Sequence, residues 1–181
     1  MARPPRILVA GGLYHVVGKA TGTDRLFVAR NDYEHFLELL TRAVDRFHWH
    51  CRAYCLMGSH YHLMLETPEP NLAAGMHRLN GMYGQAFNRR HGRAGHLFAD
   101  RYYSLLVSKE SHALELVRYI ARNPVRAGLC VAADEWSWSS YPATVGASEP
   151  PRFLESDQVL RWFSRKPTVG VERLRRFVDG P

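Results

Sequence analysis

The chain has 181 residues, of which 46% are hydrophobic and 23% are charged, and its formal net charge at pH 7 is +7. These values are typical of one globular domain, and without a run of about 18 apolar residues we expect no membrane span. The positive charge favours a polyanionic partner, although charge alone leaves that choice open. The three cysteines show no CxxC spacing, so we expect reduced thiols rather than a metal or redox motif.

The N-terminal segment 1–12 has an apolar run that is too short for a signal peptide, and we therefore expect a cytoplasmic protein. A first strand is predicted at 14–17, and a polar, Gly-containing connection follows it. Apolar residues at helical spacing then continue to Phe47, and we expect Asp32 to cap this helix.

Two strands are predicted next, at 51–56 and 60–66, and the tight turn between them indicates a hairpin. Asn71 is expected to cap a second helix that continues to about Arg90. The apolar stripe of this helix includes Met82.

A Gly-rich basic loop leads to a fourth predicted strand at 102–107. Ser111 is expected to cap a third helix. This helix is expected to end at Asn123, because the residue before a proline is disfavoured in helical conformation. The sequence then becomes rich in Gly, Pro and Ser, so we place a domain boundary near Gly146.

The predicted order of elements is β-α-β-β-α-β-α. Strands separated by helices, with one hairpin in the middle, indicate an α+β fold in which helices flank an antiparallel sheet, related to the ferredoxin-like plan. This domain covers residues 1–146. A basic tail over 147–181 follows it, and we expect one amphipathic helix at most in this tail.

His60 and His62 alternate along one predicted strand, so both imidazoles lie on the same face and can bind one metal ion. The alternative, a pair of hydrogen-bonded structural histidines, stays open for an HxH triplet alone. Leu63 and Leu65 point to the opposite face and mark it as core. Glu66 shares the histidine face and is a candidate further ligand, or a partner that orients a histidine.

Tyr119 and Asn123 lie one turn apart on the third predicted helix and share a face. A phenol is a weak nucleophile at neutral pH, because its ordinary pKa is about 10. A nearby divalent metal and the neighbouring Arg122 and Arg126 would promote its attack on a phosphate. The alternative is an ordinary amphipathic tyrosine at a helix–sheet boundary, with Asn123 as a helix cap.

Basic and aromatic residues are concentrated between the second helix and the fourth strand. Arginine binds phosphate oxygens and aromatic rings stack on unpaired bases, which suits single-stranded DNA or a hairpin with a single-stranded flank. The alternative is a basic surface above core aromatics. With the arginines of the third helix, the candidate DNA-binding residues are Arg89, Arg90, Arg93, Arg101, Arg122 and Arg126.

Taken together, these residues resemble the HUH-type single-tyrosine transposases and, more narrowly, the REP-associated tyrosine transposases, relatives of the IS200/IS605 family. The resemblance rests on five separated motifs that agree in order across residues 14–146. The motifs are YHVV at 14–17, LMGSHYHLMLET at 56–67, NRRHGRAGHLF at 88–98, RYIARNPVRAGL at 118–129 and WSSY at 138–141.

The resemblance implies an HUH nuclease fold and a role for each matching residue. His60 and His62 would bind Mg²⁺ or Mn²⁺, with Asn123 as a third, amide ligand. Tyr119 would be the nucleophile, forming a 5′-phosphotyrosine link and freeing a 3′-hydroxyl. The substrate would be a palindromic repeat folded as a DNA hairpin beside a short single-stranded guide. We expect Tyr119 to act in cis within a monomer, with a dimer as the alternative, in the nucleoid of a bacterial cytoplasm.

Two other functions stay open at this stage. One is a non-catalytic protein that binds DNA hairpins, and the other is a metal-dependent hydrolase that uses His60, His62 and a water molecule. A Tyr119→Phe substitution separates the three, because it abolishes cleavage by a tyrosine enzyme, leaves hairpin binding intact and largely spares a hydrolase.

Overall fold

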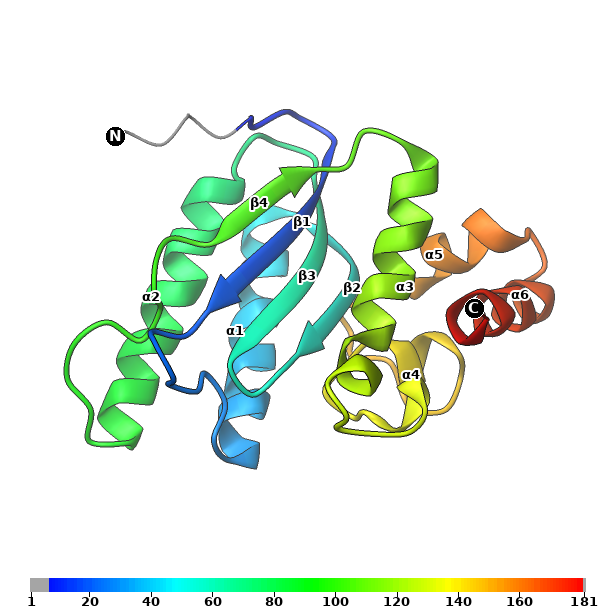
Figure 1. Cartoon of the computed structure of the whole chain (residues 1–181). Coiled ribbons are helices and arrows are strands. Elements are labelled where there is room, and N and C mark those ends of the chain that lie inside the picture. The colour runs from blue at the N-terminus through cyan, green and yellow to red at the C-terminus, as the bar shows by residue number, and fades with distance from the viewer. Residues whose placement is uncertain (1–6, 181) are drawn as a thin grey trace.

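A four-stranded antiparallel sheet forms the centre of the molecule, and its spatial order is β2-β3-β1-β4 (Figure 1). The computed structural model describes residues 7–180. Half of the N-terminal segment 1–12, for which we expect no signal peptide, therefore lies outside the described residues. The order of elements and the α+β, ferredoxin-like plan are confirmed. The strands are β1 (Gly12–Lys19), β2 (His50–Leu56), β3 (His60–Thr67) and β4 (Tyr103–Leu106).

Helices cover the two faces of this sheet unequally. α1 (Arg30–Phe47) and α2 (Leu72–Arg90) pack on one face, where Leu63 and Leu65 join the main core. α3 (Glu110–Arg126) packs over β2 and β3 on the other face, against Met64 (Figure 1). β3 is therefore buried on both sides, which explains why His62 is only 3% exposed.

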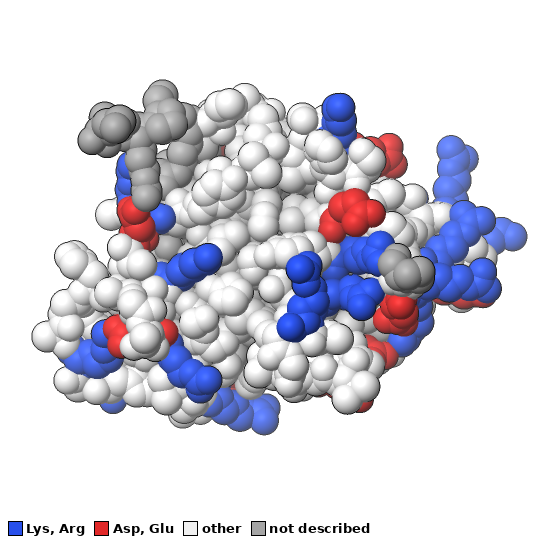
Figure 2. Space-filling model, in the orientation of Figure 1, with Lys and Arg blue, Asp and Glu red and all other residues white. Residues whose placement is uncertain are grey.

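The second face of the sheet stays open over β1 and β4. Tyr103 and Leu105 of β4 are 58% and 53% exposed. The register pairs Tyr103 with Val17, and Val17 with His62, so the open surface is continuous with the predicted histidine site. Figure 2 shows this face as an uncharged area with Lys and Arg side chains on both sides of it.

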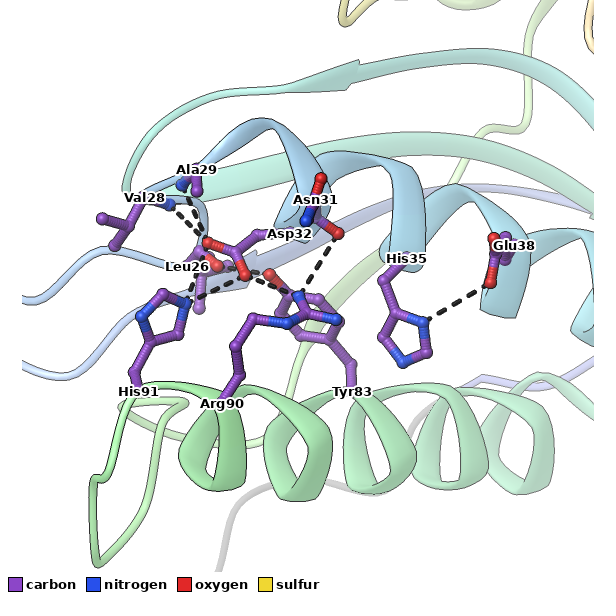
Figure 3. A network of polar contacts seen from close by, with 10 residues as sticks. All are labelled: Leu26, Val28, Ala29, Asn31, Asp32, His35, Glu38, Tyr83, Arg90 and His91. Carbon is purple, nitrogen blue, oxygen red and sulfur yellow. Dashed lines mark hydrogen bonds and ion pairs between the residues drawn. The ribbon is translucent and has the colours of Figure 1, made fainter.

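The first helix begins at Arg30, so the prediction that Asp32 caps it from outside is wrong. Asp32 is the third helical residue, and its carboxylate accepts hydrogen bonds from the backbone nitrogens of Val28 (3.0 Å) and Ala29 (2.9 Å) (Figure 3). This is the reciprocal half of a capping box, in which an acidic residue inside the helix satisfies backbone groups before it. Sequence spacing alone does not distinguish the two positions.

Asp32 also joins α1 to the end of α2. Its side chain is fully buried and accepts hydrogen bonds from Arg90 (2.8 Å) and His91 (3.0 Å) (Figure 3). Burial alone would raise the pKa of Asp32, but the hydrogen bonds from Ala29, His91, Val28 and Arg90 outweigh it and lower that pKa. The carboxylate therefore stays charged in the core.

The second helix begins at Leu72 as predicted, but the amide of Asn71 does not cap it. That amide instead accepts a hydrogen bond from Trp49 Nε1 (2.6 Å) and donates one to the backbone oxygen of Phe47 (3.1 Å). Asn71 therefore secures the end of α1. Met82 is 36% exposed, so its placement in the apolar stripe is wrong.

The third helix begins at Glu110 rather than after Ser111, and it continues through Pro124 to Arg126. The predicted end at Asn123 is therefore wrong. Proline in the last turn removes one backbone donor, and here its ring is buried, which offsets the local preference. The helix then ends on a hydrogen bond from the backbone nitrogen of Ala127 to the oxygen of Asn123 (3.0 Å).

The chain after α3 contains a 3₁₀ turn η1 (Ala133–Glu135) and helices α4 (Tyr141–Thr144), α5 (Ser156–Phe163) and α6 (Pro167–Asp179). The prediction of one tail helix at most is therefore wrong. α5 has only 8 residues, and so short an apolar pattern does not predict a second helix separate from α6. No helix within residues 7–180 is long and apolar enough to cross a membrane.

α6 packs against α3, and α5 packs against α6 and β2. Leu160 and Leu174 lie in the same buried cluster as Val117 and Ile120 of α3. The tail therefore shares a buried core with the preceding residues. The domain boundary near Gly146 stays a prediction.

Candidate active site on the open face of the sheet

His60 and His62 lie on the same face of β3, as predicted. Their ring centroids are 5.0 Å apart and the ring planes are perpendicular. His62 is only 3% exposed because α3 lies above it, whereas His60 is half-buried at the start of the strand. The predicted separation of faces holds, since Leu63 and Leu65 are buried in the core on the other side.

A third histidine, His15 of β1, completes the group and was missed by the sequence analysis. Its Nε2 atom lies 3.0 Å from Nδ1 of His62. The first-strand motif contains this histidine, but its face follows only from the pairing of β1 with β3, which places His15 opposite Met64. Period-two alternation of β1 would have found it once that register was known.

Tyr119 projects from α3 onto these histidines. Its ring centroid lies 5.3 Å from that of His62 and 6.0 Å from that of His15, with both pairs close to perpendicular. The tyrosine is 39% exposed, so the residue is partly accessible from solvent. The guanidinium carbon of Arg126 lies 5.7 Å from the centre of the tyrosine ring. The predicted nucleophile and the buried histidine therefore meet within one chain.

Asn123 lies one helical turn after Tyr119 and is half-buried. Its Nδ2 atom donates a hydrogen bond to the backbone oxygen of Tyr119 (3.0 Å). This contact leaves the amide oxygen, the atom that a cation would need, for other partners. The role of Asn123 as a metal ligand stays a prediction.

All three imidazoles are held in the neutral form at pH 7. Burial lowers the pKa of His62 to about 3, helped by His15, His60 and Lys19, and burial lowers the pKa of His15 to about 4. The pKa of His60 is lowered by burial and by the charge of Lys19. Neutral imidazole is the form that binds metal ions.

The donor atoms that remain in this group fit a divalent metal. Nδ1 of His62 contacts His15, and Nδ1 of His60 lies 3.1 Å from the hydroxyl of Ser59. Nε2 of His62 is buried and has no hydrogen-bond partner among the described residues. The Nε2 atoms of the two histidines, with an amide oxygen from Asn123, would form a mixed nitrogen–oxygen site.

Acidic side chains do not add to this donor set. Within residues 7–180, no group of three His, Cys, Asp or Glu side chains is arranged to hold a metal. Glu66, the candidate further ligand, accepts a hydrogen bond from Arg52 (2.8 Å). Further ligands would have to be water or phosphate oxygens of the substrate, which suits Mg²⁺ and Mn²⁺.

Three of the six candidate DNA-binding arginines have side chains that form hydrogen bonds or ion pairs with other described residues. Arg90 is paired with the buried Asp32 (2.8 Å), and Arg93 is paired with Asp24. Arg122 donates hydrogen bonds to backbone carbonyls at the end of α6. These arginines contribute to the tertiary structure whether or not they also contact a phosphate.

Arg89, Arg101 and Arg126 are exposed. They come from the end of α2, the connection before β4 and the end of α3. In Figure 2, Lys and Arg side chains flank the open face of the sheet on both sides. The DNA-binding role of all six arginines stays a prediction.

The family follows from a comparison of sequences. A family model described as IS200-like transposase matches residues 9–123, which is more than half of the chain. The chain belongs to the IS200-like transposase family. The family prediction is therefore confirmed, and the matched segment of this IS200-like transposase contains His60, His62, Tyr119 and Asn123. Membership implies DNA transposition, and hence cleavage and rejoining of DNA.

The solved structures that are similar to this transposase include two other transposases. A REP-associated tyrosine transposase bound to a REP hairpin has a TM-score of 0.72 and 15% identity, over 83% of this chain and 89% of that chain. A putative transposase from Deinococcus radiodurans R1 has a TM-score of 0.46 and 19% identity, over 66% of this chain and 95% of that chain. The first likeness establishes a shared fold. A search of curated proteins gives no match.

Proposed function

We propose that this transposase cleaves and rejoins single-stranded DNA next to a hairpin, with Tyr119 as the nucleophile and a divalent metal at His60 and His62. The observation that carries the proposal is the contact between the ring of Tyr119 and that of His62, whose centroids are 5.3 Å apart. The buried Nε2 of His62, which has no hydrogen-bond partner among the described residues, meets a partly exposed tyrosine and an open sheet face at this point. Structural histidines alone would not require this combination.

In the proposed reaction, the phenol oxygen of Tyr119 attacks the scissile phosphorus. The new bond joins that oxygen to phosphorus, and the bond from phosphorus to the 3′ oxygen breaks. The phenol proton passes, directly or through water, to the departing 3′ oxygen. The products are a 5′-phosphotyrosine link and a free 3′-hydroxyl, and the reverse reaction rejoins a strand.

His60, His62 and Asn123 would hold the metal, which we propose to be Mg²⁺ or Mn²⁺. IS200-like transposases are generally metal-dependent. When bound, the ion would polarise the scissile phosphate and neutralise its charge. Arg126, beside the tyrosine ring, is placed to stabilise negative charge on the attacked phosphate.

The proposed substrate is DNA folded as a palindromic hairpin. The similar REP-associated tyrosine transposase, with a TM-score of 0.72, was solved bound to a REP hairpin, and this supports a hairpin as the partner here. The exposed Arg89, Arg101 and Arg126 would contact its phosphates, with Arg90, Arg93 and Arg122 as further candidates. The arrangement of Tyr119 against His62 within one chain supports action in cis by a monomer.

Incubation with a labelled hairpin oligonucleotide, carrying a single-stranded flank, tests this proposal in the presence of Mn²⁺ or Mg²⁺. We expect a covalent DNA–protein adduct on a denaturing gel, and we expect Tyr119→Phe to abolish it. Tyr103→Phe is the matched control, because it removes a phenol oxygen from the same open face and should leave the adduct unchanged.

Two outcomes would contradict the proposal. Tight hairpin binding without an adduct under either metal would identify a non-catalytic binding protein. Cleavage that survives in Tyr119→Phe would identify a hydrolase that uses water.

A further inference from the structure

His15 approaches His62 from the neighbouring strand. The register pairs His15 with Met64 and Val17 with His62, so the two histidines are diagonal neighbours on one face. Nε2 of His15 lies 3.0 Å from Nδ1 of His62. The ring centroids are 5.2 Å apart, which is close to the largest separation that a nitrogen–nitrogen distance of 3.0 Å allows, and the ring planes differ by 22°. The two nitrogens therefore point at each other, as in a hydrogen bond.

The direction of this hydrogen bond decides what His62 can do. Two neutral imidazoles bond only when one nitrogen carries the hydrogen and the other has a lone pair. If His15 donates, His62 carries its own hydrogen on Nε2, and that buried N–H has no acceptor among the described residues. Leaving such a donor unpaired costs about 1–3 kcal/mol. If His62 donates from Nδ1, its Nε2 keeps a lone pair that a cation can satisfy.

We propose that His15 is a positioning residue for the metal site, which accepts the Nδ1 hydrogen of His62 and so keeps the Nε2 lone pair of His62 available to the ion. The inference rests on the proposed function, because it concerns the same metal. His15 needs no contact with the ion or with DNA. It acts through the tautomer and the ring orientation of His62, as partners behind metal-binding histidines do.

Two features of the surroundings support this role. The cross-strand partners of His15 are Met64 and Leu105, so an apolar residue would pack against both neighbouring strands and would avoid the desolvation of an imidazole. His60 has the same organisation as His62, because its Nδ1 lies 3.1 Å from the Ser59 hydroxyl. In both predicted ligands, the nitrogen with a neighbouring partner is Nδ1.

Nuclear magnetic resonance of the metal-free protein with labelled histidines measures the tautomer of His62 directly. We expect hydrogen on Nδ1 in the unchanged protein and loss of this preference in His15→Leu. His15→Gln retains an oxygen acceptor and should restore it. Hydrogen on Nε2 of His62 in the unchanged protein would overturn the proposal, whatever the variants do.

Titration with Mn²⁺, followed by the electron paramagnetic resonance of the free ion, gives a second measurement. We expect His15→Leu to weaken Mn²⁺ binding about 10–100-fold, and His15→Gln to bind nearly as well as the unchanged protein. His35→Leu is the matched control, because this half-buried histidine contacts Glu38 on α1, across the sheet from the site. Unchanged Mn²⁺ affinity in a folded His15→Leu would overturn the proposal.

The adduct assay separates this inference from the proposed function. An unchanged protein that forms the Tyr119 adduct, while Mn²⁺ binding is insensitive to His15→Leu, refutes the role of His15 alone. An unchanged protein that forms no adduct refutes the proposed function, and the tautomer of His62 still decides the role of His15. If His15→Leu fails to fold, His15→Gln and the tautomer of the unchanged protein decide it.

Discussion

Arg122 donates a hydrogen bond of 2.9 Å to the backbone oxygen of Gly180, and this contact ties the helix that carries Tyr119 to the C-terminal end of α6. Arg118 donates to the same oxygen at 2.6 Å. Carbonyls at a helix end have no partner within the helix and attract cations. The tail therefore helps to hold the proposed nucleophile helix, and it engages an arginine that the sequence suggested for DNA.

Arg122→Ala should therefore lower stability more than DNA affinity. We expect the free energy of unfolding to fall by about 2 kcal/mol, because a half-buried charged donor is removed and the backbone oxygens of Val178 and Gly180 lose its hydrogen bonds. Urea denaturation measures this effect. The comparison is Arg89→Ala, at an exposed position, which should leave stability unchanged and weaken hairpin binding. It should also reduce the slope of log binding constant against log salt concentration by about 1, because one phosphate contact is lost. The reverse pattern would make Arg122 the phosphate contact.

Asp32→Ala should destabilise the fold by about 3 kcal/mol, because it removes a buried carboxylate that accepts hydrogen bonds from Val28, Ala29, Arg90 and His91. Glu34→Ala, at an exposed position two residues later that pairs with Arg30, should change stability by less than about 1 kcal/mol. Thermal or urea unfolding compares the two. Similar values would show that the buried network contributes little.

Two glycines in α2 should respond to alanine with opposite signs. A Cβ atom on Gly75 would lie 2.1 Å from the ring of Trp49, so Gly75→Ala should destabilise by about 1–3 kcal/mol. A Cβ atom on Gly81 would meet nothing within 4 Å among the described residues. Gly81→Ala should therefore stabilise by roughly 0.5–1 kcal/mol through helix propensity. Stability curves of the two variants check the prediction, and equal effects would refute the close approach of Trp49.

Stability should fall as the pH drops below about 6.5. The pKa of His62 is lowered to about 3 and that of His15 to about 4, so the unfolded chain binds protons that the folded chain excludes. The loss continues until the pH reaches these folded values. Between pH 6.5 and 5 we expect about 3 kcal/mol for the two histidines together.

Urea midpoints measured at several pH values test this, and His62→Gln should flatten the dependence by removing its share. The lowered pKa of Asp32 acts in the same direction but in a separate window, because its contribution is lost only as the pH falls below the ordinary value of 3.8. A midpoint that does not change between pH 6.5 and 5 would contradict burial of neutral histidines.

Much of the secondary structure was predictable because it depends on local periodicity. Alternation of period two placed His60 and His62 on one face, and helical spacing placed Tyr119 and Asn123 one turn apart. Helix ends were less predictable. Burial of Pro124 outweighs its local preference, and Asp32 stabilises its helix from the third position rather than from the cap.

The sequence by itself determined the family, the order of strands and helices, and which residue types could do the chemistry. The tertiary structure decided which of them meet: the register of β1 against β3 brings His15 to His62, and α3 brings Tyr119 over the pair. It also decided that the tail engages Arg122. The physical reason is that these contacts join residues far apart along the chain, so they depend on strand register and helix packing, which no local pattern encodes.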